Sequence, residues 1–178
     1  MIAKPKTATV AFTTPKGTAM YPWLNKADYQ YHSEGQYKVQ LRVANDDAKP
    51  LMADIEATAK EAFGEADAKS ARMPWKKDAE AGEVIFSCKS KFKPKMVDST
   101  GALIQSPSEP AIYGGSTLKL AGTMYPYNAG GGKGISLQLA GVQIIDLSDG
   151  SGAATVSFEA EEGGFVAAND NEAGGHDF

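Results

Sequence analysis

The residues best suited to chemistry in this 178-residue chain are basic, because seven of its 18 Lys and Arg residues lie between Arg72 and Lys95. Lys89, Lys91 and Lys93 recur at every second residue, the spacing that places side chains on one face of a β-strand. Alternate strand residues lie about 6–7 Å apart, close to the phosphate spacing of an extended single strand. The pattern indicates a row of phosphate-binding cations; the alternative is a solvated face, or lysines that blunt a sheet edge. The cluster also contains Lys76, Lys77 and Lys95.

Aromatic side chains are placed among these cations. Tyr21–Trp23 and Tyr125–Tyr127 are both aromatic–Pro–aromatic triplets. By strand alternation, the two tyrosines of the second triplet continue the outward face that carries Lys119. Bases stack on exposed aromatic rings and phosphates bind cations, so this combination favours sequence-independent binding of single-stranded nucleic acid. The alternative is that about half of the tyrosines cap the core, and we expect this of Tyr29 and Tyr37.

No segment has the spacing of a catalytic or metal-binding motif. The glycine-rich run Ala129–Gly134 contains Lys133, but Gly follows the lysine where a phosphate-binding loop needs Ser or Thr. The run lies between two strand-like segments and is predicted to be a hairpin. His32 has no partner at ligand spacing, and the single cysteine, Cys88, lies on the apolar face of its strand. We therefore expect no enzyme activity, no metal and no cofactor.

The net charge of −4 is unevenly distributed along the chain. Residues 1–145 contain all 18 basic and 14 acidic residues, a net +4, whereas residues 146–178 contain eight acids and no Lys or Arg, a net −8. A basic body with an acidic tail is typical of nucleic-acid or membrane partners, or of a regulatory tail. No segment has the length and apolar character of a signal peptide or a membrane span, so we expect a cytoplasmic protein that does not bind membranes.

Positioning these side chains requires mostly β-structure. One helix is predicted from Pro50, as its first helical residue, to Ala66, and Asp67–Gly82 is predicted to be a loop. Gly141 marks a bulge or bend, because the buried phase slips there. Five strands are predicted: Thr7–Phe12, Gln36–Ala44, Val84–Lys93 (with Phe86, Cys88 and Phe92 on its inward face), Thr117–Met124 and Ile135–Leu147.

This pattern predicts a mainly β protein with a five-stranded OB-fold barrel and one inserted α-helix, and a sandwich or jelly roll is the alternative. The barrel domain is expected over residues 1–147. Residues 148–178 are rich in Gly, Ala, Ser and acids. Because such a segment buries too little apolar surface to offset its ordering entropy, it is predicted to be a disordered, flexible acidic tail.

Several segments, taken in chain order, are also shared with a known family: Tyr21–Tyr29, Tyr37–Leu41, Leu51–Phe63, Phe86–Phe92, Ile112–Lys119, Tyr125–Tyr127, Ser136–Leu139 and Asp177–Phe178. The first matches the family's Tyr-x-aromatic-apolar-x-Lys-x-Asp-Tyr segment. Together they resemble the replication single-stranded DNA-binding proteins of T-odd-type tailed phages, which have one OB-fold and an acidic tail ending in Phe. Where the family has a second aromatic soon after its Pro-Tyr, this chain has Asn128–Gly130, so that stacking position is either missing or supplied by Tyr125 or Tyr113.

The resemblance implies sequence-independent binding of single-stranded DNA during phage replication and recombination, in the infected bacterial cell. Its stacking tyrosine corresponds to Tyr127, and its tail, ending in Asp177 and Phe178, would recruit replication proteins such as the polymerase and the helicase/primase. The protein would act as a monomer or homodimer. Together with the strand-face pattern, the resemblance assigns base stacking to Tyr127, Tyr125, Tyr113, Trp23, Tyr21 and Phe92. Phosphate binding is assigned to Lys89, Lys91, Lys93, Lys119, Lys133, Arg72, Lys76 and Lys77.

Two other classes of protein are open to the sequence. A β-sandwich structural or adaptor protein of a virion would carry the same lysines as merely solvated side chains, and it would not bind oligo-dT. An enzyme on a barrel scaffold would need a catalytic cluster, and the sequence offers none.

Overall fold

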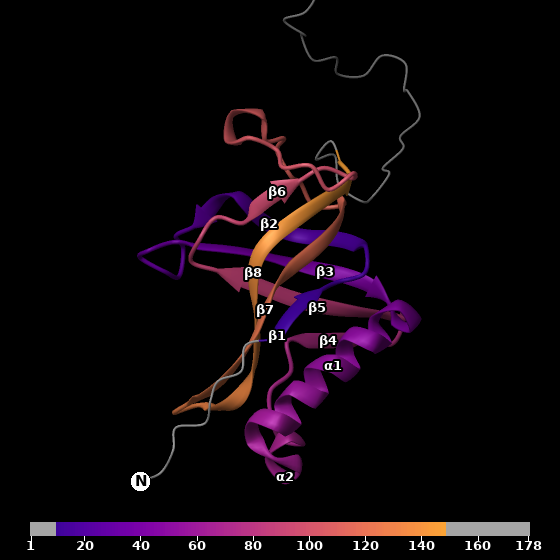
Figure 1. The fold of residues 1–178 in the computed structure, drawn as a ribbon, viewed down its shortest axis with the longest axis vertical. Helices are drawn as coiled ribbons and strands as arrows, with labels where there is room; N and C mark the ends of the chain where they lie inside the picture. The colour runs from indigo at the N-terminus through magenta and orange to yellow at the C-terminus, as the bar shows by residue number, and fades with distance from the viewer. Residues whose placement is uncertain (1–9, 149–178) are drawn as a thin grey trace, which may run out of the picture.

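The computed structural model describes residues 10–148, which form a mainly β structure with two helices (Figure 1). The predicted tail lies outside these residues. In chain order the elements are β1 (Val10–Thr13), β2 (Gly17–Asp28), β3 (Gln36–Ala44), α1 (Asn45–Phe63), α2 (Glu65–Ala68), β4 (Trp75–Asp78), β5 (Glu83–Ser90), β6 (Lys95–Val97), a 3-10 turn (Ser106–Ser108), β7 (Thr117–Ala129) and β8 (Gly132–Asp146).

Five of the strands pair in a ring, in the order β2–β3–β5–β8–β7 and back to β2. Every pairing in the ring is antiparallel except β5–β8. The ring is only partly closed, because β5–β8 and β2–β7 each share two residue pairs. A partly open five-stranded barrel is the OB-fold architecture, so the predicted fold class is confirmed. The short strands β1, β4 and β6 extend the sheet beyond the ring.

One strand of the ring, β2, is absent from the predicted set. The predicted strand Thr7–Phe12 is instead the short outer strand β1, which the structure describes from Val10. Alternation fails along β2 because its pairing with β3 shifts between Met20 and Trp23, leaving one extra residue on β2. Pro22 lies inside this bulge, where a strand tolerates a residue without an N–H group.

The predicted bulge near Gly141 and the predicted glycine hairpin are both confirmed. Gly122 pairs with Leu139 and Ala121 pairs with Gly141, so β8 carries one extra residue between them. The buried phase of β8 accordingly shifts from Leu137 and Leu139 to Val142 and Ile144. Ala129 pairs with Gly132, and two glycines make the turn between β7 and β8.

The main helix begins five residues before its predicted start, at Asn45 instead of Pro50. β3 runs directly into it, so the helix starts where the strand ends, without a separate proline signal. Pro50 has no N–H to donate to the carbonyl of Asp46. Both residues are exposed, so water can donate to that carbonyl instead. The helix stops at Phe63 because Gly64 adopts a left-handed φ of 84°. Ala66, predicted to end this helix, lies in α2.

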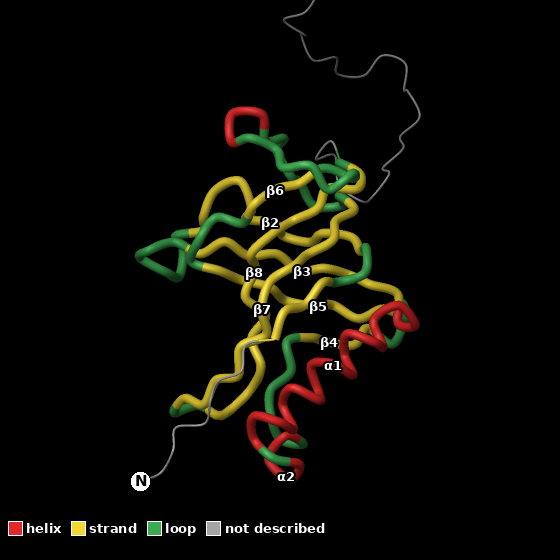
Figure 2. Tube along the Cα trace, viewed as in Figure 1, coloured by secondary structure: helices red, strands yellow, loops and turns green. Residues whose placement is uncertain are grey.

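The helices close one end of the ring. α1 contacts β1, β3, β5, β7 and β8, and Figure 2 shows both helices together beside the strands. Leu51, Ile55 and Ala59 are buried on its inner face, as predicted. The barrel core above them includes the fully buried Phe86 and Met124. No helix in the described part of the chain is long and apolar enough to span a membrane.

The predicted loop Asp67–Gly82 contains a strand, β4, which pairs with β5. Trp75 anchors it by packing edge-on against Phe86, with the ring centroids 6.3 Å apart. The alternation of β4 is too short to reveal it in the sequence, and burial of one aromatic ring decides its position. Lys76 and Lys77 therefore lie on an outer strand of the sheet and are exposed.

Candidate nucleic-acid interface

A groove crosses the outer face of the ring where β2, β3, β5, β7 and β8 come together. It has a volume of about 480 Å³ and is called the central groove below. The predicted site residues Tyr21, Trp23, Lys89 and Tyr127 line it together with Lys38, which was not predicted. Its walls thus combine aromatic rings with cations, as the pattern of the sequence indicates.

The floor of the groove is made by two neighbouring strands whose side chains are in register. Lys38 of β3 pairs with Lys89 of β5, and Gln40 pairs with Ser87. Like charges directly opposite each other on a sheet repel, so two facing lysines require compensation. That compensation comes from the next strand, where Asp28 binds Lys38 at 2.7 Å.

Asp28 is a buried carboxylate at the end of β2, with 5% of its surface exposed. It accepts a hydrogen bond from Lys38 and another from the backbone N–H of Gln30 at 2.9 Å. These bonds favour the charged form, and together they hold the pKa of Asp28 below its ordinary value of 3.8. The pair leaves Lys89 as the groove lysine whose charge has no carboxylate within ion-pair distance among residues 10–148. Positive charge in the groove is therefore centred on Lys89.

Tyr127 owes its position to a glycine on the neighbouring strand. It pairs with Gly134 across the β7–β8 hairpin. A Cβ added at Gly134 would lie 2.6 Å from the tyrosine hydroxyl, so the ring occupies the space that a side chain would fill. The residue pairs on either side of Tyr127–Gly134 belong to the same antiparallel ladder between β7 and β8. This ladder holds the half-buried ring at the groove wall.

Tyr21 and Trp23 reach the groove through the bulge in β2. Tyr21 has a φ of 49°, a left-handed conformation that is uncommon for a bulky residue and especially before a proline. Its side chain is 71% exposed although it lines the groove. Strained backbone of this kind persists where the surrounding structure enforces it, and it concentrates at binding sites. The bulge therefore presents both aromatic rings to the same groove.

Other predicted cations lie away from the central groove. Lys133 binds Asp67 of α2 at 2.8 Å and lies over the ring of Phe63 at 5.9 Å, so the hairpin lysine is turned toward the helices. Arg72 uses its backbone, which pairs with Lys133 and Ile135 at the groove rim, and its side chain is exposed. The remaining predicted residues that do not line the central groove are Tyr113, Tyr125, Lys76, Lys77, Lys91, Phe92, Lys93 and Lys119.

The expected row of three lysines with an inward Phe92 is not formed. β5 ends at Ser90, whose hydroxyl accepts the N–H of Phe92 at 3.0 Å, and strand alternation stops there. Phe92 is consequently 81% exposed rather than buried beside Phe86. Lys91 and Lys93 leave the strand face and pair with Glu34 and Glu109 respectively. Only Lys89 of the three lysines lies on the strand itself.

The expected core role is corrected for Tyr29, whereas for Tyr37 it stays a prediction. Tyr29 is 66% exposed, because it lies just beyond the end of β2 and its ring covers Gly35 instead of the barrel interior. Tyr37 is half-buried at the start of β3. Cys88, by contrast, is a core residue as predicted, and burial raises the pKa of its thiol to about 12.

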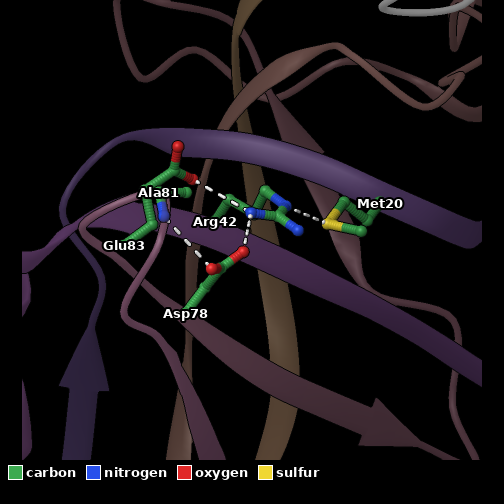
Figure 3. A network of polar contacts seen from close by, with 5 residues as sticks. All are labelled: Met20, Arg42, Asp78, Ala81 and Glu83. Carbon is green, nitrogen blue, oxygen red and sulfur yellow. Dashed lines mark hydrogen bonds and ion pairs between the residues drawn. The ribbon is translucent and has the colours of Figure 1, made fainter.

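Beyond Gln40, the same face of β3 carries a charge network centred on Arg42 (Figure 3). Its guanidinium binds Asp78 at 3.1 Å and Glu83 at 3.5 Å, and it donates to Met20 Sδ at 2.8 Å. The N–H of Ala81 and then Arg42 lower the pKa of Asp78. Arg42 is therefore already neutralised by carboxylates, so positive charge declines along this face away from Lys89.

Sequence reasoning missed Lys38, Asp28 and the two glutamines Gln36 and Gln40, all of which line the groove. The strict alternation of Gln36–Ala44 could have identified three of them, because its polar face carries Gln36, Lys38 and Gln40. Within the described residues, no group of His, Cys, Asp and Glu side chains could hold a metal ion.

Comparisons with known proteins agree with this geometry. A family model described as "Enterobacter phage Enc34, ssDNA-binding protein" matches residues 16–173. The single-stranded DNA-binding protein of Enterobacteria phage T3 is 28% identical over 90% of this chain and 87% of its own length. That of Escherichia phage T7 is also 28% identical, over 91% of this chain and 87% of its own length.

Solved structures show the same fold. The crystal structure of gp2.5, a single-stranded DNA-binding protein encoded by bacteriophage T7, superposes with a TM-score of 0.66 at 29% identity, covering 90% of this chain and all of that one. The single-stranded DNA-binding protein from bacteriophage Enc34 in complex with ssDNA has a TM-score of 0.62 at 18% identity, covering 80% of this chain and 89% of that one.

Proposed function

Because the chain belongs to the family of the single-stranded DNA-binding protein of Enterobacter phage Enc34, we propose that it binds single-stranded DNA, without sequence preference, in the central groove. The observation that carries the proposal is the convergence of Tyr127, Trp23 and Tyr21 on the groove that contains Lys89. Stacking accepts any base and a lysine accepts any phosphate, so neither contact selects a sequence.

The width of the groove sets the length of strand it can hold. From Tyr127 on β7 to Trp23 on β2 the path crosses β8, β5 and β3, four strand spacings or about 19 Å. This corresponds to about three extended nucleotides. One base would stack on Tyr127, one on Trp23 or Tyr21, and the phosphate between them would lie near Lys89. Outside the groove, Arg72, Lys76, Lys77 and Lys119 remain candidate contacts for a longer strand.

The proposed biological role is non-enzymatic. The protein would coat and protect single-stranded DNA during phage replication and recombination, in the cytoplasm of the infected bacterium. The domain would extend over residues 1–147 and act as a monomer or homodimer. The acidic tail from residue 148 would recruit replication proteins through Asp177 and Phe178.

The charge distribution supports a second role for the tail. A −8 segment tethered to a +4 body is attracted to its cationic groove, over a distance near the Debye length of about 10 Å. Without DNA the tail would occupy the groove, and on DNA it would be displaced and present Phe178. Deleting residues 148–178, which leaves β8 intact, should then tighten DNA binding and abolish partner recruitment. Equal DNA affinity with and without the tail would refute the competition.

Fluorescence titration tests the central proposal, because one tryptophan lies in the groove and the other lies outside it. Single-stranded oligo-dT should quench Trp23, and Trp75→Phe should retain that quenching while Trp23→Phe loses it. Double-stranded DNA should bind more weakly, since paired bases cannot stack on the groove rings. Equal affinity for the two forms, or quenching carried by Trp75, would contradict the proposal. A virion adaptor would not bind the oligonucleotide at moderate salt.

A further inference from the structure

The central groove continues at one end into two smaller hollows. One is lined by Tyr31, Glu34, Gln36 and Lys91, among others, and the second by Gln36, Lys89, Lys91 and Phe92. Gln36 lines all three cavities, and Lys89 lines the central groove and the second hollow. The three cavities therefore adjoin one another at Gln36.

Two connections meet at this end of the ring, at the left of Figure 1. They are the β2–β3 turn, residues 29–35, and the β5–β6 connection, residues 91–94. An ion pair joins them, because Lys91 lies 3.7 Å from Glu34. Local hydrogen bonds hold both segments: the N–H of Gly35 donates to the His32 carbonyl at 3.0 Å, and the N–H of Phe92 donates to the Ser90 hydroxyl at 3.0 Å.

Each connection presents an aromatic ring to solvent. Phe92 is 81% and Tyr31 is 77% exposed, the highest values among the large apolar residues of the described chain. Neither ring contributes to the core, so folding stability does not explain them. Tyr31 also lies 5.9 Å from the ammonium of Lys38, which places it beside the central groove. Lys91 lines both hollows, with Tyr31 in one and Phe92 in the other. This end of the ring therefore repeats the combination of aromatic rings and a cation found in the central groove.

We propose that Tyr31 and Phe92 form a second base-stacking subsite for the same DNA strand, the distal subsite, with Lys91 as its phosphate-binding residue. This inference rests on the proposed function of the central groove. A DNA phosphate that binds Lys91 displaces the carboxylate of Glu34 from it, so one anion replaces another at the ammonium group. The exchange is feasible because both side chains are about three-quarters exposed, and ion pairs in water are weak.

The distal subsite has a consequence for oligonucleotide length. An oligo-dT of about three nucleotides fills the central groove alone, whereas one of about twelve reaches both sites. Tyr31→Ala and Phe92→Ala should each weaken binding of the longer oligonucleotide by about tenfold and leave the shorter one unchanged. Glu34→Gln should strengthen binding of the longer one severalfold, because it removes the carboxylate that competes with phosphate. Leu103→Ala is the control, because Leu103 is an exposed apolar residue that lines none of the three cavities and has no assigned role in binding.

The outcomes separate this inference from the proposed function. If Tyr31→Ala and Phe92→Ala bind the longer oligonucleotide as well as the wild type while Tyr127→Ala does not, the distal subsite is overturned and the central groove stands. Loss of affinity for both lengths in Tyr31→Ala or Phe92→Ala would also overturn it, because the rings would then serve the central groove. If the wild type binds neither length, the proposed function fails and the distal subsite fails with it.

Discussion

Replacing Tyr127 by alanine removes the proposed stacking surface at the β7 side of the central groove. Base stacking on an aromatic side chain contributes about 1–3 kcal/mol per base, which corresponds to roughly a 5- to 150-fold change in affinity. The ring lies over Gly134, which has no side chain of its own to replace that surface when the ring is removed. Lys38 is bound by Asp28, and Lys89 already serves the phosphate in the proposed complex, so neither cation gains a contact when the ring is removed. We expect a loss in the upper half of this range.

The assay is quenching of Trp23 by oligo-dT in the Trp75→Phe background, at fixed low salt. Tyr127→Phe is the matched variant, because it keeps the ring over Gly134 and removes only the hydroxyl. It should bind within about twofold of the wild type, since stacking uses the face of the ring. Leu103→Ala, which removes an exposed apolar side chain that does not line the groove, should bind like the wild type.

Two results would refute this reasoning. An unchanged affinity of Tyr127→Ala would remove the residue from the binding site. If Tyr127→Phe lost as much affinity as Tyr127→Ala, the hydroxyl would be the binding group and stacking would not explain the loss. The thermal midpoint of each variant should be measured alongside, because the ring is half-buried and its removal also lowers stability.

Three further perturbations test the charges and the backbone. Lys89→Gln should reduce the salt dependence of DNA binding by about 0.7 log units per decade, whereas Lys60→Gln on α1 should not change it; equal slopes would exclude the Lys89 contact. The depressed pKa of Asp28 stabilises the folded state above its ordinary pKa, and this contribution is lost as the pH falls through the lower folded value. Asp28→Asn should therefore flatten the fall in the free energy of unfolding at acidic pH, measured by urea denaturation, and an unchanged slope would contradict the assignment. Gly122→Ala should lower the thermal midpoint strongly, because the added Cβ would overlap the Gln138 carbonyl. Gly130→Ala should melt like the wild type, because its Cβ meets no atom of the described residues within 4 Å.

Regular alternation made several elements predictable from the sequence. β3 has the predicted bounds, Gln36–Ala44, because buried and polar residues alternate along its full length. The bulge at Gly141 was predictable for the same reason, since an extra residue reverses the phase of the pattern. β2 was missed because its own bulge and Pro22 interrupt the alternation. The predicted start of α1 was five residues too late, because Pro50 is tolerated inside an exposed turn of the helix.

The sequence by itself determined the types of contact that this protein can make: aromatic rings near lysines, a basic body and an acidic tail. Only the tertiary structure decided which of them act together. Tyr125 and Tyr127 share a face of β7, yet Tyr127 alone of the two lines the groove. Lys38, Lys91 and Lys133 are each paired with a carboxylate on another part of the chain, whereas Lys89 has no such partner within residues 10–148. The physical reason is that ion pairs and stacking depend on a few ångströms of separation in space, and the fold sets that separation independently of position along the chain.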